Sequence, residues 1–196
     1  MKSNMMKISK KPIPSFMLPA LIILLNSEHF CSLASWNVPD ITKFYAVNEK
    51  IWTINSTMFW PKYCQVDVVY AASPKYAFFN RSHVQNHTKY MEYLLGQFTN
   101  IDFYGIKTTT RNAMKVAPRN GTSFQSIEQL LYEYDNYKCG VFNVSLLQQL
   151  NDHYYDLRVK DSAVKHPNPS CVEMFLELSR FEKVTTLYTN SCLHSG

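Results

Sequence analysis

The feature that most constrains the fold of this chain is a series of short segments rich in Tyr, Phe, Val, Ile and Thr, separated by turn residues. Segments of this kind are typical of β-strands, and their recurrence predicts an all-β sandwich or barrel. A small closed barrel needs eight strands, so one of nine candidates is expected to be misread, and 101–107 is the weakest. The nine candidates are 50–58, 64–71, 75–80, 90–98, 101–107, 111–117, 126–134, 138–144 and 154–160.

Two helical segments flank these strands. Residues 167–180 begin with prolines and then repeat apolar residues at helical spacing, and residues 40–47 show a weaker helical pattern. We therefore expect an eight-stranded antiparallel lipocalin-like barrel with a short N-terminal helix and a C-terminal helix plus strand. Asn120-Gly121 marks a hairpin turn. An immunoglobulin-like sandwich is the alternative, but no Trp lies between Cys64 and Cys139, where that fold buries one.

Residues 1–34 have the order of a secretory signal peptide: early lysines, an apolar block over 16–25, and small residues at the end. Ser32 and Ala34 predict cleavage after Ala34, which leaves one barrel domain over 35–196. A retained membrane anchor is the alternative, but the apolar block is interrupted by Pro19 and is far shorter than the roughly 20 residues that span a bilayer. We expect a secreted, extracellular protein that has no membrane contact after cleavage.

Charge and cysteine content follow from this cleavage. Loss of four lysines and Glu28 with the leader lowers the formal net charge from +5 to +2. No basic cluster follows the leader, so no nucleic-acid partner is expected. Cleavage also removes Cys31, and an exported domain with four cysteines indicates two disulfides, for which three pairings are possible. The four are Cys64, Cys139, Cys171 and Cys192.

Five Asn-x-Ser/Thr sites predict glycosylation, and each glycosylated Asn must face solvent. Because side chains alternate along a strand, an outward Asn143 would turn Phe142 and Val144 inward, and an outward Asn55 would turn Trp52 inward. The five sites are Asn55, Asn80, Asn86, Asn120 and Asn143.

Enzymatic and metal chemistry have little support in the sequence. His83 and His87 are spaced by four residues, but no third ligand is evident and His87 lies within a glycosylation site, so no metal is expected. No nucleophile, zinc-protease, P-loop or dinucleotide motif occurs, so neither an enzyme nor a cofactor is predicted. The 13 Tyr and 12 Phe residues instead suit the lining of a small-ligand pocket.

Several segments resemble the tick salivary lipocalins of the histamine-binding-protein family. They are IWTINST shortly before Cys64, CGVFNV from Cys139, YYDLRV at 154–159, CVEMFLELSR from Cys171, and LYTNSC ending at Cys192. The resemblance implies a ligand-binding barrel with disulfides Cys64–Cys192 and Cys139–Cys171.

The amine binders of that family carry Cys-Asp-Val and, after a gap, Glu-Leu-Trp or Glu-Leu-Tyr, whose two acids help to hold a cationic ligand. Here Gly140 replaces the first acid, and the second motif reads Asp156-Leu157-Arg158. The resemblance places Tyr154, Asp156 and Arg158 in the cavity; the alternative leaves both charges on the surface. An inward Arg158 would compete with a ligand ammonium for Asp156 and would suit a carboxylated lipid better.

We therefore expect a monomeric scavenger that sequesters a small host mediator, with histamine or another biogenic amine implied by the resemblance. A lipid mediator such as a leukotriene is the alternative ligand. A protein-binding immunomodulator that engages a host defence protein, and a glycoprotein without a specific ligand, are the alternative functions. The candidate ligand-binding residues are Trp52, Phe142, Tyr154, Asp156 and Arg158.

Overall fold

The structure is a computed structural model that describes residues 37–148 and 152–194. The predicted leader, its cleavage site and Cys31 lie outside the described residues. No helix in the described ranges is long and apolar enough to cross a membrane.

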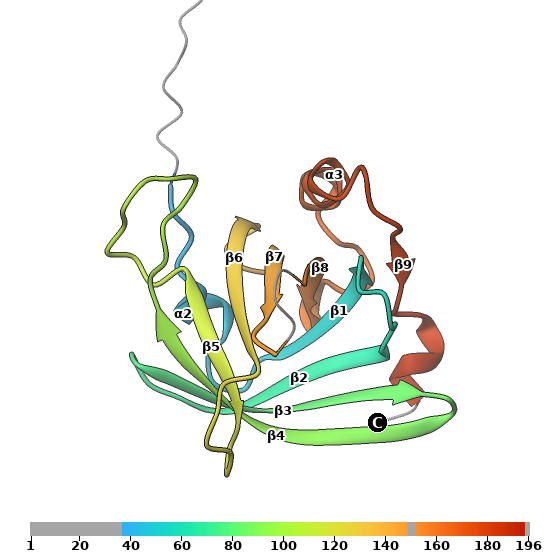
Figure 1. Ribbon diagram of the computed structural model, residues 1–196. Helices are drawn as coiled ribbons and strands as arrows, with labels where there is room; N and C mark the ends of the chain where they lie inside the picture. The colour runs from blue at the N-terminus through green and yellow to red at the C-terminus, as the bar shows by residue number, and fades with distance from the viewer. Residues whose placement is uncertain (1–36, 149–151, 195–196) are drawn as a thin grey trace, which may run out of the picture. The chain divides into compact units, whose positions relative to one another are not determined.

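The described chain folds as strands framed by two α-helices (Figure 1). The elements are α2 (Ile41–Phe44), β1 (Lys50–Ser56), β2 (Tyr63–Ala72), β3 (Tyr76–Gln85), β4 (Thr88–Thr99), β5 (Ala113–Pro118), β6 (Ser126–Tyr134), β7 (Cys139–Leu146), β8 (His153–Lys160), α3 (Pro169–Leu178) and β9 (Thr185–Thr186). Two 3-10 turns, η1 (Asp161–Ala163) and η2 (Asn190–His194), follow β8 and β9.

Strands β1 to β8 form a closed antiparallel barrel in the described part of the chain. Each strand from β1 to β7 pairs with the next one along the chain, and β8 pairs with β1, which closes the barrel. The two residues of β9 pair with Asn55 and Ser56 at the end of β1. This arrangement confirms the predicted fold. Of the nine candidate strands, 101–107 was misread: it carries one isolated bridge, between Phe103 and Ile106.

Antiparallel alternation gives the barrel two different ends. The connections 73–75, 100–112 and 135–138 share one end with α2, whose buried Ile41 and Phe44 pack into the barrel interior. Asp40 starts α2 by accepting a hydrogen bond from the Thr42 backbone N–H at 3.0 Å. We call this the closed end. The connections 57–62, 86–87 and 119–125 lie at the opposite, open end.

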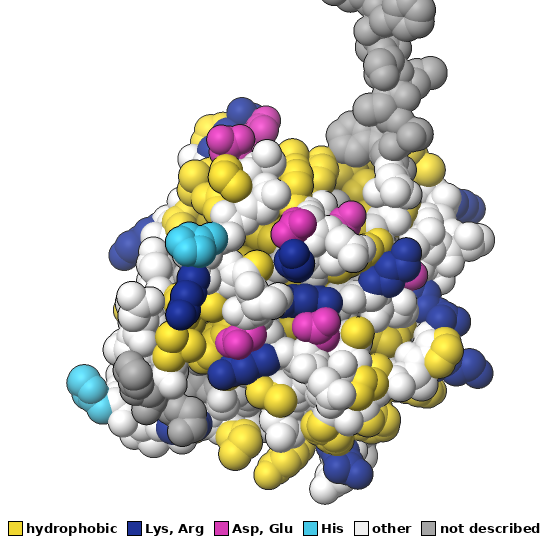
Figure 2. Space-filling view, turned by 180° about the vertical axis from the view of Figure 1, so that it is seen from behind, with side chains coloured by type: hydrophobic (Ala, Val, Ile, Leu, Met, Phe, Trp, Pro, Cys, Tyr) yellow, Lys and Arg dark blue, Asp and Glu magenta, His cyan; other side chains and the backbone are white. Residues whose placement is uncertain are grey.

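The surface of the domain carries charges of both signs. Its exposed ion pairs include Lys50–Asp161 and Lys138–Asp135. Figure 2 shows acidic and basic side chains interspersed on the face seen from behind, without a broad area of one sign.

Two apolar cores share the strands. One fills part of the barrel interior and includes Phe44, Phe79 and Phe142. The other lies outside the barrel, where Phe175 of α3 packs with outward residues of β7, β8 and β1. The sequence starts α3 at this position because Asn168 caps it, accepting from the Ser170 N–H at 2.9 Å, and Pro169 occupies its first turn.

Both disulfides expected from the resemblance are present. Cys139–Cys171 joins β7 to the first turn of α3, and Cys64–Cys192 joins β2 to the C-terminal segment. They close loops of 32 and 128 residues. In the chain-entropy model, loops of this length stabilise the fold by roughly 3–5 kcal/mol each.

The predicted inward orientation of Trp52 is wrong. The pairing of β1 with β8 shifts register between Thr53 and Asn55, so simple alternation fails at this point. Trp52 and Ile54 belong to the outer core, and Trp52 packs against Tyr188 with ring centroids 5.0 Å apart. The alternation rule holds on β7, where Phe142 and Val144 lie in the inner core.

Candidate ligand-binding site

The middle of the barrel interior contains a network of buried charges rather than apolar side chains. Arg81 of β3 lies between two carboxylates. It donates to Asp67 of β2 through Nε and Nη2, at 2.7 and 2.8 Å, and to Glu128 of β6 through Nη1 and Nη2, at 2.8 and 3.1 Å. All three side chains are nearly inaccessible to solvent.

Arg158 of β8 completes the network from the other side of the barrel. It contacts Glu128, donates to Asp156 Oδ2 at 2.8 Å, and donates to the Tyr45 hydroxyl at 2.7 Å. The Tyr45 hydroxyl in turn donates to Asp67 Oδ2 at 2.7 Å. The Phe142 ring lies under the Arg158 guanidinium, 4.6 Å from its central carbon. We call Tyr45, Asp67, Arg81, Glu128, Asp156 and Arg158 the polar network.

Mutual pairing keeps Glu128 and the two guanidinium groups ionised despite their burial. Burial alone would raise the pKa of Glu128, but Arg158 and Arg81 act in the opposite direction and hold that pKa well below its usual range. Burial would lower the pKa of Arg81, and the charges of Asp67 and Glu128 raise it further than burial lowers it. Glu128, Arg81 and Arg158 therefore stay charged at neutral pH.

The network is not balanced. It holds three carboxylates against two guanidinium groups, so its formal charge is −1. The excess is accompanied by an unpartnered acceptor: Asp156 Oδ1 is buried and has no hydrogen-bond partner, whereas its Oδ2 accepts from Arg158. A buried carboxylate oxygen without a donor is costly, and a cationic donor would remove that cost.

A pocket of about 270 Å³ lies at the open end of the barrel, and no residue of the polar network lines it. Tyr154, two residues nearer the open end than Asp156 on the same face of β8, lines it. Met58, Phe59 and Trp60 from the β1–β2 connection and Leu146 at the end of β7 form its apolar part. Phe59 and Trp60 are 83% and 69% exposed and pack edge to face, with ring centroids 4.8 Å apart. We call this the mouth pocket.

Lys62 also lines the mouth pocket. Burial lowers the pKa of its ammonium group, and Arg81 lowers it further, while Glu92, Glu128 and Asp156 partly offset both effects. Lys62 is therefore a cation of the chain itself that lies within the field of the polar network.

Gly140 explains why the first acid of the amine-binding motif is absent. A Cβ atom at this position would lie 2.8 Å from both Leu130 and Phe44, closer than real Cβ contacts allow. Phe44 of α2 thus occupies the space that a side chain at 140 would need. The interior acids come instead from Asp67 and Glu128, on strands β2 and β6.

Four of the five candidate ligand residues face the interior. Tyr154, Asp156 and Arg158 point inward, and Leu157 and Val159 lie outside in the core beneath α3. Phe142 also faces inward, but it supports Arg158 at depth rather than lining the mouth pocket. Trp52 lies on the opposite side of the wall.

The predicted glycosylation sites differ in exposure. Asn86 and Asn120 are exposed in open-end turns, as a glycan requires, whereas Asn55, Asn80 and Asn143 are half-buried on strands. The two spaced histidines do not meet: His83 is buried and stacks on Tyr90, while His87 is exposed in the turn after β3. Among the described residues no group of three or more metal-ligating side chains occurs.

Sequence reasoning missed most of the network. Tyr45, Asp67, Arg81 and Glu128 were not singled out, and neither was Lys62. A signal was present: Asp67, Arg81 and Glu128 each stand within a run of strand-forming residues, where a charge on the inner face requires a partner. The residues that pair are far apart in sequence, for example 47 positions between Arg81 and Glu128.

Comparison with solved structures supports the barrel class. AM182, solved as a serotonin complex, shares 13% identity over 77% of this chain and 90% of that chain, with a TM-score of 0.55. Japanin from Rhipicephalus appendiculatus, bound to cholesterol, shares 6% over 79% and 100%, with a TM-score of 0.52. The cockroach allergen Per a 4 shares 14% over 80% and 92%, with a TM-score of 0.51. At these identities the likeness concerns the fold.

A closed antiparallel barrel with a polar interior and a pocket at one end defines a lipocalin-type protein that binds small ligands. The model of the family described as tick histamine binding protein matches residues 36–194. The chain belongs to the tick histamine-binding protein family. Comparison with curated protein sequences finds no match.

Proposed function

We propose that this protein is a secreted scavenger that sequesters a small aromatic amine of the host, of the histamine or serotonin class, at the open end of its barrel. The observation that carries this proposal is Asp156, whose Oδ1 is buried without a donor while its Oδ2 is held by Arg158. Asp156 is fully buried and does not line the mouth pocket, so a ligand ammonium would have to displace Tyr154 to reach Oδ1. There it would supply the missing donor and neutralise the formal excess charge of the network.

The charges around the mouth pocket favour a cation. Asp152 lines the pocket, and Glu92 acts electrostatically on Lys62 together with the network. These groups and the polar network amount to five carboxylates against Arg81, Arg158 and Lys62, so the described groups carry a net negative charge. A field of this sign attracts an ammonium group and repels a carboxylate.

The walls of the mouth pocket suit an aromatic ligand. Phe59 and Trp60 offer ring edges and faces to a planar ring, and a pocket of about 270 Å³ has room for a small ligand rather than a large one. The AM182 barrel, solved with serotonin, supports the same ligand class.

The alternative of a carboxylated lipid bound by Arg158 has less support. Arg158 contacts Glu128, Asp156 and Tyr45 at once. A ligand carboxylate would have to displace one of these partners and leave a buried acid unpaired.

Isothermal titration of the secreted protein with serotonin, histamine and a leukotriene tests the proposal. We expect one equivalent of at least one amine to bind. Asp156→Asn should weaken amine binding about tenfold or more, whereas Asp135→Asn, at an exposed pair on the closed end, should not change it.

A second variant guards against misfolding of the first. Leu146→Trp would fill the mouth pocket without touching the polar network, and it should abolish amine binding while the barrel stays folded. Tight leukotriene binding without an amine response would overturn the proposal, and so would amine binding that both Asp156→Asn and Leu146→Trp leave intact.

A further inference from the structure

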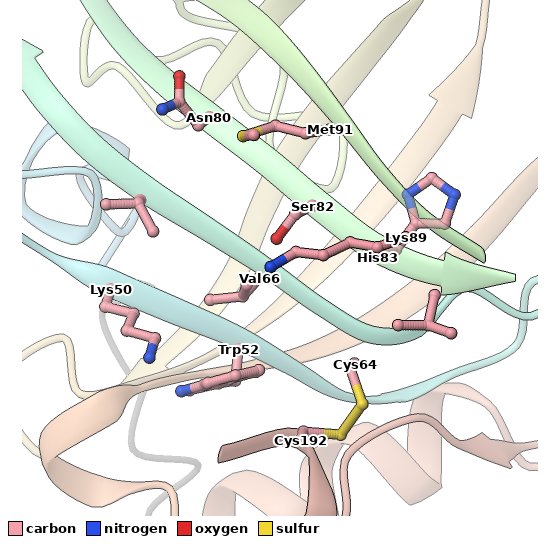
Figure 3. A pocket seen from close by; sticks show the side chains of 12 residues that line it. Lys50, Trp52, Cys64, Val66, Asn80, Ser82, His83, Lys89, Met91 and Cys192 are labelled. Atoms are coloured by element: carbon pink, nitrogen blue, oxygen red, sulfur yellow. A yellow bond between two sulfur atoms is a disulfide. The ribbon is translucent and has the colours of Figure 1, made fainter. Parts of the chain in front are cut away.

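A second concave site lies on the outside of the barrel, on the outer face of β1 to β4 (Figure 3). The strand register builds it, because directly paired residues point to the same face. Trp52 pairs with Val66, Val66 with Ser82, and Ser82 with Met91, so these four side chains form one row across four strands. We call this site the outer groove.

The glycosylation motif at Asn80 lies in the outer groove. Asn80 and Ser82, the first and third residues of the motif, both line the groove, and Figure 3 shows both on β3. Arg81 between them points into the barrel, where it pairs with Asp67 and Glu128. Because side chains alternate along a strand, these interior ion pairs hold the two motif residues on the outer face.

The surroundings of Asn80 are apolar and exposed. Its direct partners on the neighbouring strands are Val68 of β2 and Tyr93 of β4, whose side chains are 41% and 56% exposed. Met91 of β4, which is 55% exposed, lies diagonally across from Asn80, and Figure 3 shows the end of its side chain beside Asn80. Exposed apolar side chains gathered around one polar residue indicate that another group packs there.

The Asn80 side chain has an unpartnered acceptor and open space beside it. Its Oδ1 is buried and has no hydrogen-bond partner. The Asn55 side chain, at another glycosylation motif, instead donates to the Thr186 hydroxyl at 3.2 Å. The groove has a volume of about 260 Å³, below the range of about 300–1,000 Å³ usual for ligand pockets. A ring-sized group tethered to the chain suits this space better than a free ligand, because the tether makes its binding intramolecular.

A sugar has the chemistry that this groove requires. The C–H groups on the faces of a sugar ring pack on apolar side chains, and its hydroxyl and acetamido groups hydrogen-bond at the edges. We propose that Asn80 carries an N-glycan whose first N-acetylglucosamine packs in the outer groove, against Val68 and Met91. This inference rests on the proposed secretion, because the chain meets the oligosaccharide donor during export.

The attachment is a group transfer from an oligosaccharide linked to a lipid diphosphate. Asn80 Nδ2 forms a bond to C1 of the first N-acetylglucosamine, and the bond between C1 and the diphosphate oxygen breaks. The lipid diphosphate leaves with that electron pair, and Nδ2 gives up one proton to a base of the transferring enzyme. The Ser82 hydroxyl completes the acceptor motif. Folding then brings the first sugar onto the groove wall, while the outer sugars stay in water.

Mass spectrometry of peptides from protein secreted by insect cells tests the attachment. We expect a glycan at Asn80 as well as at Asn120, which is exposed in a turn. Ser82→Ala should abolish the glycan at Asn80, whereas Ser82→Thr, which keeps the motif, should retain it. A protein that carries a glycan at Asn120 and none at Asn80 would overturn the proposal and leave secretion standing.

Thermal unfolding tests whether the sugar packs in the groove. Asn80→Gln and Ser82→Ala should each lower Tm by about 2–4 °C, the shift for one modest contact in a chain of this size. Asn120→Gln should stay within about 1 °C of the parent protein. Enzymatic trimming of every glycan to its first N-acetylglucosamine should preserve Tm. In protein made in a bacterial periplasm, which adds no such glycan, Asn80→Gln should leave Tm unchanged.

A variant of the groove wall separates packing from a general effect of a surface glycan. Met91→Ser removes an exposed wall side chain and keeps the motif, so in this background Asn80→Gln should lower Tm by less than it does in the parent protein. Leu176→Ser, at a 51% exposed position on α3, should leave the effect of Asn80→Gln unchanged.

Three results would overturn the proposal. One is an unmodified Asn80, and a chain without glycans at all of its motifs would count against secretion as well. Another is a glycosylated protein in which Asn80→Gln does not lower Tm. The third is an equal loss of Tm from Asn80→Gln in the parent and Met91→Ser backgrounds. Amine binding is tested separately by the titration with serotonin and histamine, so the two proposals can fail independently.

Discussion

The inside and the outside of the same barrel wall have opposite chemistry in this protein. On β2 and β3 the inward residues Asp67 and Arg81 are charged, while the outward Val66 and Val68 line an apolar groove. Barrels and sheets usually bury their apolar face and expose the polar one. The inversion shows that the interior is not merely a folding core: the chain tolerates buried charge there, and it keeps apolar side chains on a surface that water reaches.

The largest expected effect is a loss of unfolding free energy when a buried charge is removed from the barrel interior. Glu128→Gln removes the carboxylate that both guanidinium groups share, and it therefore breaks two buried ion pairs. We expect this variant to lose about 3–5 kcal/mol of unfolding free energy, measured by urea denaturation. Glu177→Gln, at an exposed site on α3, should stay within about 0.5 kcal/mol of the parent protein. A Glu128→Gln protein as stable as its parent would mean that the network is not held by these pairs.

Lowering the pH should reduce the stability that Glu128 contributes to the folded protein. The pKa of Glu128 is held well below its ordinary value of 4.5 in the folded state, so protons bind the unfolded state first. Its stabilising contribution is fully present above about pH 4.5 and is lost as the pH falls below that value toward the folded pKa.

The measurement is unfolding free energy between pH 7 and pH 3. The parent protein and the control variant Glu177→Gln should lose stability with nearly the same slope as the pH falls. Glu128→Gln should show a shallower slope over the same interval. Equal slopes for all three proteins would contradict the assignment of Glu128 as a strongly coupled acid.

The smallest effect concerns Lys62, the lysine of the chain that lies in the mouth pocket. Lys62→Met should raise amine affinity about fivefold, or roughly 1 kcal/mol, because the ligand no longer competes with a cation for the field of Asp156 and Glu128. A fall in amine affinity would show instead that Lys62 holds the ligand.

The local pattern of the sequence determined the strands, the two helices and the cysteine framework. Alternation along a strand and capping at a helix start act between neighbours, so they can be read from the chain alone. The resemblance to one family then supplied the disulfide pairing and the inward orientation of Asp156 and Arg158. Tyr154 and Phe142 were also placed correctly on the inner face.

Only the tertiary structure decided what those residues meet. A register shift in β1 turned Trp52 from the interior to the outer core, and α2 filled the space beside Gly140. Arg81, Glu128 and Arg158 come from three strands, and closure of the barrel brings them together. Contacts between distant segments depend on register and closure, which no local pattern encodes. For that reason the sequence indicated a ligand-binding barrel, whereas the polar network and the mouth pocket on which the proposed amine site rests became visible only in the structure.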